Sequence, residues 1–137
     1  MIYVFDASFV GALIIPDEKN PKVDKIRANI GKNEEIFAPH LLWYEISNLF
    51  KNLLRRKRYT FDEVLEFFPP LTAVRITCDF ETGTGYAEKL LRLCSDYNIS
   101  SYDAAYLELA GRKKAALCTL DENLIVSAKE YGVTVLK

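Results

Sequence analysis

The chain has 137 residues, of which 50% are hydrophobic and 27% are charged, so we expect one soluble globular domain spanning residues 1–137. Its 18 basic and 19 acidic residues give a net charge of −1, which argues against a protein whose whole surface binds nucleic acid. No apolar run approaches the roughly 20 residues that span a bilayer, and no basic leader precedes Ile2, so we expect a cytoplasmic protein without a membrane partner.

Short β-leaning runs alternate with helical patterns along the chain. In chain order we expect a strand at 2–5, helices at 9–15, 21–30, 41–57 and 60–70, a strand at 74–77, helices at 84–97 and 102–114, a strand at 115–120, a helix at 123–131 and a strand at 133–136. Thr60 and Glu63 form a capping-box pattern, and Pro69-Pro70 is expected to end that helix. The alternation indicates an α/β domain of three layers, α/β/α, with a mostly parallel central sheet.

Two carboxylates directly follow predicted strands. Asp6 follows the first strand, and Asp121 follows the strand at 115–120. In an open parallel sheet, ligands bind in the crevice beyond the carboxyl ends of the strands, so two central strands would bring both acids to that edge. The alternative is that each acid only caps the helix that follows it.

Two further carboxylates interrupt the apolar side of predicted helices. At about 100° per residue, Glu45 projects between Leu49 and Leu41, beside the apolar stripe of its helix. Asp103 lies on the same side as Leu107. The alternatives are that Glu45 reaches water or pairs with a basic residue, and that Asp103 simply complements the helix dipole in a first turn.

Convergence of these acids has an energetic consequence. Two carboxylates about 4 Å apart repel by roughly 4 kcal/mol at an effective dielectric near 20, so gathered acids take up protons or bind a cation. Hard oxygen ligands without a cluster of histidine or cysteine favour Mg²⁺ or Mn²⁺ over zinc, and the chain has one histidine and three scattered cysteines. A site of this kind suits phosphoryl chemistry.

Four short motifs contain these acids: Tyr3-Val4-Phe5-Asp6-Ala7-Ser8, Tyr44-Glu45-Ile46-Ser47-Asn48-Leu49, Ser101-Tyr102-Asp103-Ala104-Ala105-Tyr106 with Ala110, and Thr119-Leu120-Asp121-Glu122-Asn123-Leu124. In this order, over essentially the whole chain, they resemble the PIN-domain nucleases. Within that family they are similar to the VapC-type toxins of bacterial and archaeal toxin–antitoxin pairs. Each motif alone is weakly specific, whereas the four together in order are considerably more so.

The resemblance implies a PIN-like domain that cleaves RNA as a metal-dependent endoribonuclease, forms a homodimer and is blocked by a small VapB-like antitoxin. Carried over by position, the catalytic and metal-binding acids are Asp6, Glu45, Asp103 and Asp121, which would bind Mg²⁺ or Mn²⁺. Ser8 and Thr119 match supporting hydroxyl residues of the family. Glu122 is an alternative to Asp121, because the fourth acid is the more variable one in the family.

The resemblance also implies a different role for each acid. Asp6 and Asp103 hold one ion, Glu45 orients or activates the attacking water, and Asp121 assists a second ion or holds ordered water. In-line attack then leaves a 5′-phosphate and a 3′-hydroxyl. Basic residues near the end of the helix carrying Glu45 are candidate RNA contacts, with a solvated helix end as the alternative; they are Lys51, Arg55, Arg56 and Arg58.

Other functions stay open at this point. A PIN nuclease of housekeeping RNA maturation has the same motifs, and a neighbouring antitoxin reading frame would separate the two. A receiver-like, Mg²⁺-binding signalling module needs an acid pair after the first strand, where Asp6 has no acidic neighbour. A haloacid-dehalogenase-type phosphatase needs D-x-D where this chain has Asp6-Ala7-Ser8. A silent binding module is the remaining alternative.

Overall fold

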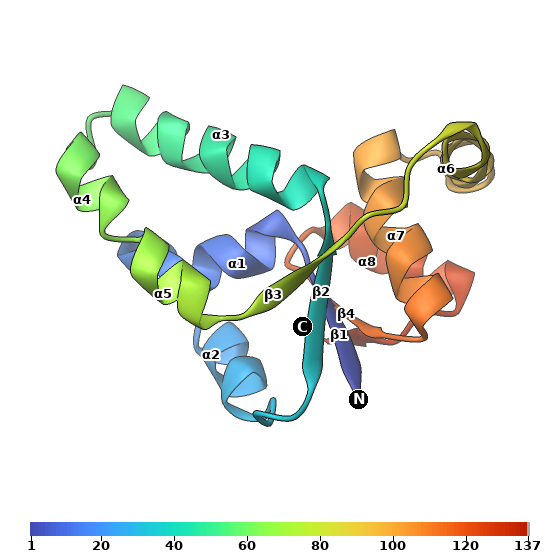
Figure 1. Cartoon of the computed structure of the whole chain (residues 1–137), viewed down its shortest axis with the longest axis horizontal. Coiled ribbons are helices and arrows are strands. Elements are labelled where there is room, and N and C mark those ends of the chain that lie inside the picture. The colour runs from blue at the N-terminus through green and yellow to red at the C-terminus, as the bar shows by residue number, and fades with distance from the viewer. Residues whose placement is uncertain (137) are drawn as a thin grey trace.

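The computed structural model describes residues 1–136, which form a parallel β-sheet with helices on both faces (Figure 1). The five strands of this part of the chain lie in the order β3-β2-β1-β4-β5, and every neighbouring pair is parallel. They are β1 (Ile2–Phe5), β2 (Glu35–Pro39), β3 (Ile76–Asp79), β4 (Ala116–Cys118) and β5 (Val135–Leu136). The expected α/β/α fold is confirmed, and the sheet is wholly rather than mostly parallel.

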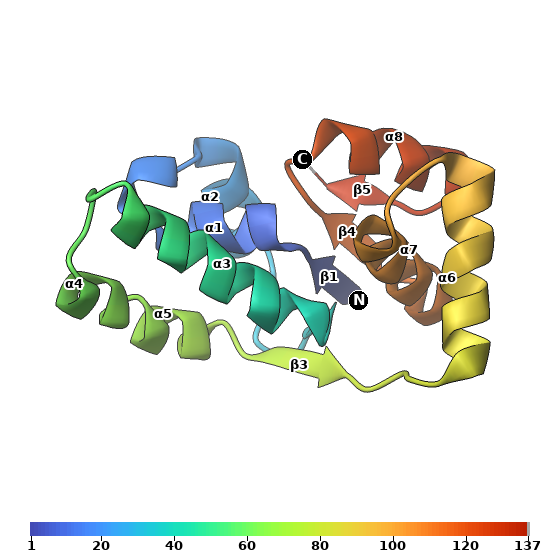
Figure 2. The same ribbon diagram turned by 90° about the horizontal axis from the view of Figure 1, so that it is seen from above.

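Figure 2 shows the two helical layers, one on each side of the sheet. The first layer consists of α1 (Ala7–Ile14), the short 3₁₀ helix η1 (Pro16–Glu18), α2 (Pro21–Ala28), α3 (Leu41–Arg55), α4 (Phe61–Leu65) and α5 (Phe68–Ala73). The second consists of α6 (Thr84–Tyr97), α7 (Ser101–Lys113) and α8 (Glu122–Tyr131). Because successive strand residues point to opposite faces, Phe5 packs in the first layer's core and Val4 in the second's.

The centre of the sheet positions the site. β1 pairs with β2 on one side and with β4 on the other, so the strand order changes direction at β1. Such a switch point leaves a crevice at the carboxyl ends of the two central strands, which is where ligands bind in open α/β sheets. Helix α3 packs against α1 beside this crevice, and α7 packs against β1, β2 and β4.

Local sequence signals explain where the helices begin. Asn20 and Ser100 accept backbone hydrogen bonds as N-caps of α2 and α7, and Thr60 and Glu63 make the predicted capping box at α4. Helix α6 has the predicted bounds. Helix α1 begins two residues earlier than predicted because Asp6 caps it. No helix within residues 1–136 is long and apolar enough to cross a membrane.

The elements differ from the expected ones in three places. Strand β2 was not predicted at all. Pro69-Pro70 does not end the helix that starts after Thr60: that helix stops at Leu65, and the prolines lie in the first turn of α5, where a missing N–H is tolerated. The strand predicted at 74–77 begins at Ile76, because Arg75 has a left-handed φ of 61°.

An ion-pair cluster holds α7 against the edge of the sheet. Arg112 on α7 bonds Asp79 at the end of β3, 2.6 Å between Nη2 and Oδ2, and Glu108 on its own helix, 2.9 Å between Nε and Oε2. Burial alone would raise the pKa of Asp79, but the hydrogen bonds and charge of Arg112 lower it below its ordinary value. The cluster fixes the helix that carries Asp103.

Candidate active site

Asp6 is the most enclosed carboxylate at the crevice, with 5% of its surface exposed. It follows β1 directly and caps α1, since its Oδ1 accepts the N–H of Phe9 at 2.9 Å. The Ser8 hydroxyl donates to the same oxygen at 2.7 Å, and the Thr119 hydroxyl donates to Oδ2. Helix capping and a place in the site are therefore not alternatives for this residue, because one carboxylate does both.

The two hydroxyls tie the ends of β1 and β4 together. Ser8 Oγ accepts the N–H of Leu120 at 2.9 Å, and Thr119 Oγ1 accepts the N–H of Asp121 at 3.0 Å. Asp121 caps α8 by accepting two backbone N–H groups, and its side chain lies at the exposed rim. The supporting positions predicted for Ser8 and Thr119 thus lie against Asp6, between the two strands.

Glu45 reaches the crevice from the second turn of α3. Its Oε1 accepts a hydrogen bond of 2.5 Å from the hydroxyl of Tyr106 on α7, and this tyrosine is only 2% exposed. The bond joins the two helical layers across the carboxyl end of the sheet. Burial and the bond to Glu45 raise the pKa of Tyr106 far above its ordinary value, so the tyrosine stays a proton donor.

Asp103 stands in the first turn of α7 and is half-buried. Its backbone N–H donates to the Ser100 cap at 3.1 Å. Burial is the largest cause that raises the pKa of its carboxyl, followed by the negative charges of Asp121 and Asp6. An acid in a first turn suits the helix dipole, yet here it also faces two other acids.

The four acids share one electrostatic environment. Burial raises the pKa of Asp6 and of Glu45, the hydrogen bonds from Thr119 and Tyr106 oppose that rise, and neighbouring carboxylates add to it. The negative charge of Asp121 raises the pKa of Asp6, and the charges of Asp6 and Asp103 raise the pKa of Glu45. Within residues 1–136, however, no three histidine, cysteine or acidic side chains are gathered closely enough to form a ready-made metal-binding group. The four acids therefore influence one another's charge, but they are not close enough together to form a ready-made metal site.

Other predicted residues lie outside this cluster. Glu122 is exposed at the start of α8 and does not affect the pKa of Asp6, Glu45 or Asp103. The four predicted RNA contacts are exposed at and beyond the far half of α3, and Arg58 is paired with Asp17 at 3.3 Å. At 1.5 Å per residue, the first arginine of the group stands about 15 Å along the axis from Glu45.

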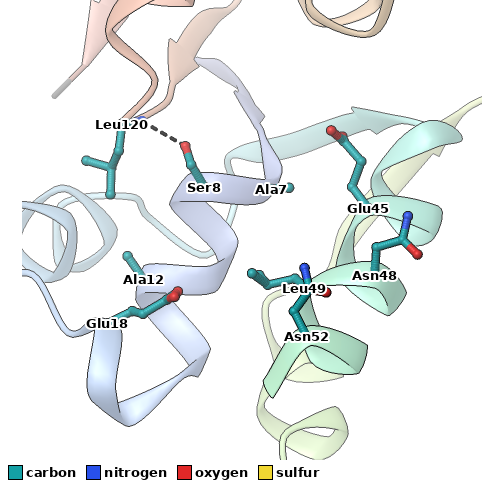
Figure 3. A pocket seen from close by; sticks show the side chains of 9 residues that line it. All are labelled: Ala7, Ser8, Ala12, Glu18, Glu45, Asn48, Leu49, Asn52 and Leu120. Atoms are coloured by element: carbon teal, nitrogen blue, oxygen red, sulfur yellow. Dashed lines mark hydrogen bonds between the residues drawn. The ribbon is translucent and has the colours of Figure 1, made fainter. Parts of the chain in front are cut away.

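Two features of the site were not predicted from the sequence. Tyr106 was part of a quoted motif, but nothing in one sequence indicated its bond to a helix 61 residues away. The second feature is a cavity of about 640 Å³ between α1 and α3, with Glu45 in its lining (Figure 3). Asn48 and Asn52 follow Glu45 at helical spacing, and that repeat was the available signal.

Comparison with known proteins identifies the family. The family model described as PIN domain matches residues 3–130. The chain belongs to the PIN domain family. This agrees with the resemblance carried by the four acidic motifs, and it decides against the receiver-like and phosphatase alternatives.

Relatives of this PIN domain cover nearly its whole length. It is 31% identical over 134 residues to Ribonuclease VapC3 of Pyrobaculum aerophilum, covering 90% of this chain and 92% of the relative. Among solved structures, PAE2754 of Pyrobaculum aerophilum has a TM-score of 0.71 at 22% identity, covering 99% of this chain and 92% of the other. VapBC2 of Rickettsia felis, bound to a promoter DNA fragment, has a TM-score of 0.70 at 13% identity, covering 98% and 97%. The two structures support the fold.

Proposed function

We propose that this PIN domain is a divalent-metal-dependent endoribonuclease and the toxin of a VapBC-type toxin–antitoxin pair, acting in the cytoplasm. The observation that carries the proposal is the convergence of Asp6, Glu45, Asp103 and Asp121 from four separate parts of the chain at the switch point of the sheet. The similarity to Ribonuclease VapC3 supplies the substrate class.

The chemistry of the donors fits Mg²⁺ or Mn²⁺. The quartet offers only carboxylate oxygens, and the nearby side chains that touch it carry hydroxyls. The pKa values of Asp6, Glu45 and Asp103 are raised first by burial and further by neighbouring carboxylates, and a bound cation would relieve both costs of ionisation. When bound, such an ion lowers the pKa of water and offsets charge on the phosphate that is attacked.

Each acid has a role that follows from its surroundings. Asp6 is fixed by three donors, so it is suited to hold a cation in one place, together with Asp103 across the crevice. Glu45 has a raised pKa and one oxygen held by Tyr106, which leaves its other oxygen to orient the attacking water and accept a proton. Asp121 closes the exposed rim and assists the cation or ordered water.

The basic residues at the end of α3 serve RNA rather than only the helix dipole. Lys51, Arg55 and Arg56 are exposed, and the chain as a whole carries almost no net charge. A polyanion is therefore attracted by a local patch and not by the overall field. Arg58 is a weaker candidate, because it is already paired with Asp17.

The toxin assignment rests on the relatives. VapBC2 of Rickettsia felis and VapBC-1 of nontypeable Haemophilus influenzae match this fold over 98% of the chain each. Combined with the similarity to Ribonuclease VapC3, this supports a VapB-like antitoxin as partner. A homodimer as the assembled form is part of the proposal and follows from the family resemblance alone. Copurification of a small protein encoded next to this chain tests the partner directly. Its absence would favour a housekeeping nuclease.

The deciding experiment is cleavage of structured and unstructured RNA by antitoxin-free protein, with Mg²⁺, Mn²⁺ or EDTA. We expect metal-dependent cleavage in the wild type and none in Asp6→Asn. Equal activity in both proteins would reveal a contaminant and refute the assignment of the quartet. Products ending in a 5′-phosphate and 3′-hydroxyl are expected, whereas a 2′,3′-cyclic phosphate would identify the ribose hydroxyl as nucleophile and refute the role of water.

A further inference from the structure

The cavity between α1 and α3 extends from the acidic cluster along α3 (Figure 3). Its apolar lining comes from Ala7, Ala12, Leu49 and Leu120. Its polar lining comes from Ser8, Glu18, Glu45, Asn48 and Asn52. A cavity of about 640 Å³ lined by both apolar and polar groups has the size and composition of a small-molecule site.

The polar groups of the lining fall into two sets. Ser8 and Glu45 are engaged by other residues of the acidic cluster. The side chains of Glu18, Asn48 and Asn52 make no hydrogen bond to any residue of 1–136. Figure 3 shows Glu18 on the α1 side of the opening and the two asparagines on the α3 side. These three groups are free to recognise a ligand.

A close helix contact forms this part of the cavity. A Cβ atom at Gly11 of α1 would lie 2.9 Å from Leu49 Cδ2 and 3.1 Å from Glu18 Oε2. The absence of a side chain at Gly11 therefore lets the leucine and the carboxylate both lie against α1. Glu18 is exposed at the rim of the cavity, and glycine at position 11 lets its carboxylate approach α1 there.

We propose that this cavity binds the base of the nucleotide next to the scissile phosphate, and that Glu18 makes guanine the preferred base. The inference rests on the proposed ribonuclease function and names a specificity-determining residue for it. Glu45 lies at one end of the cavity, and Asn52 stands about 10 Å further along the helix axis. At this distance, one RNA strand can place its reacting phosphate at the acids and a neighbouring base in the cavity.

The same helix supplies the next contact. Arg55 and Arg56 follow Asn52 by three and four residues, so they lie on the same side of α3 one turn further on. A strand that places its reacting phosphate at Glu45 and a base between Glu18 and Asn52 then meets these cations with its next phosphate. The order along α3 is thus acid, base pocket, basic patch.

The choice of guanine follows from the donors and acceptors. An ionised carboxylate only accepts hydrogen bonds, and the Watson–Crick edge of guanine offers two adjacent N–H groups to it. Adenine and cytosine offer one amino group, and uracil offers one N–H between two carbonyls that repel a carboxylate. The asparagine amides can donate to the guanine carbonyl oxygen. The expected order is guanine, then adenine and cytosine, then uracil.

The test is a map of cleavage sites in a random-sequence RNA pool for the wild type, Glu18→Gln and Glu130→Gln. Glu130 is exposed on α8 and does not line the cavity, so its substitution makes the same change in charge elsewhere. We expect roughly tenfold enrichment of guanine at one position beside the cut in the wild type and in Glu130→Gln. In Glu18→Gln that enrichment falls below about twofold while total cleavage persists.

The outcomes separate this inference from the proposed function. Cleavage with the same profile in Glu18→Gln as in the wild type overturns the base pocket and leaves the ribonuclease intact. A partner protein that fills the cavity while RNA is cleaved with its full guanine preference overturns it as well. If the wild type cleaves no RNA, labelled hexaribonucleotides differing in one base still test the pocket. Equal affinities for guanine and uracil then refute it, and a guanine preference that Glu18→Gln removes supports it.

Discussion

Thr119 joins Asp6 to β4, and its substitution by valine should weaken the protein in a pH-dependent way. The residue is fully buried, its hydroxyl donates to Asp6 Oδ2, and it accepts the N–H of Asp121 at 3.0 Å. Thr119→Val keeps the shape and removes both hydrogen bonds. A bond to a charged group contributes about 1.5–3 kcal/mol, and the Asp121 N–H lies near water, so we expect a loss of about 2–3 kcal/mol in the free energy of unfolding at pH 7.

The sign of the pH dependence follows from Asp6. Burial raises the pKa of this carboxyl in the folded protein, and the Thr119 bond partly opposes the rise. Removing the bond raises the folded pKa further, so the folded state prefers the protonated acid even more. The destabilisation is fully present above the folded pKa. It shrinks as the pH falls through the raised folded pKa values, because Asp6 is then protonated in the folded state of both proteins.

Urea denaturation of wild type and Thr119→Val at pH 7 and at about pH 4.5 measures both effects. Thr77→Val is the matched control, since Thr77 is exposed on β3 and makes no contact with the site. We expect less than about 0.5 kcal/mol from the control at either pH. An equal loss at the two pH values in Thr119→Val, or a loss as small as the control's, would refute the reasoning.

Three further predictions concern the acids and their partners. Tyr106→Phe removes the bond that lowers the pKa of Glu45, so the acid limb of the pH–rate profile moves to higher pH, and stability falls by about 1–2 kcal/mol in thermal melts. Mg²⁺ or Mn²⁺ at about 100 times its Kd stabilises the wild type by roughly 2.7 kcal/mol, with a smaller rise in Tm for Asp6→Asn and none in EDTA. Arg112→Met leaves two poorly exposed carboxylates without their cation and lowers stability by about 3 kcal/mol at pH 7. Because Asp79 has a lowered folded pKa, its contribution is present above the unfolded pKa and is lost as the pH falls, so urea melts should show a smaller effect in acid.

Each of these has a result that contradicts it. An unchanged acid limb in Tyr106→Phe would mean that Glu45 does not need to be ionised for turnover. Equal metal-induced shifts of Tm in wild type and Asp6→Asn would place the ion elsewhere. A loss in Arg112→Met that grows as the pH falls would show that the carboxylates, once protonated, still need the arginine.

The elements with strong local signals were predictable from the sequence, and those that depend on neighbours were not. The bounds of helix α6 were predicted from its own sequence pattern, and the capping box at Thr60 predicted the start of α4. Strand β2 follows a charged loop, and it is defined by pairing with β1 and β3, contacts that one sequence does not reveal. Pro69-Pro70 marked a helix boundary correctly but on the wrong side, since proline fits a first turn as well as it ends a helix.

The candidate site divides in the same way. The four acids were found because each breaks an apolar pattern or follows a strand, which is a property of the local sequence. Tyr106, whose hydroxyl holds Glu45, has no such signal, because a buried tyrosine is ordinary in a helix core. Glu18 was also missed, since it is an exposed acid in a short 3₁₀ helix and gains meaning only from the glycine beside it.

Because β4 pairs with β1, the site is complete only after the C-terminal part of the chain has been made and folded. Asp6 is made among the first residues of the chain, yet the Thr119 hydroxyl that fixes it and the strand that flanks it come after residue 115. Loop closure between such distant segments comes late in folding. A chain cut before β4, or one whose β4 is still in the ribosome, holds Asp6 without the Thr119 hydroxyl and without Asp121. Activity therefore appears only with the completed molecule, which delays a nuclease that could otherwise attack the message being translated.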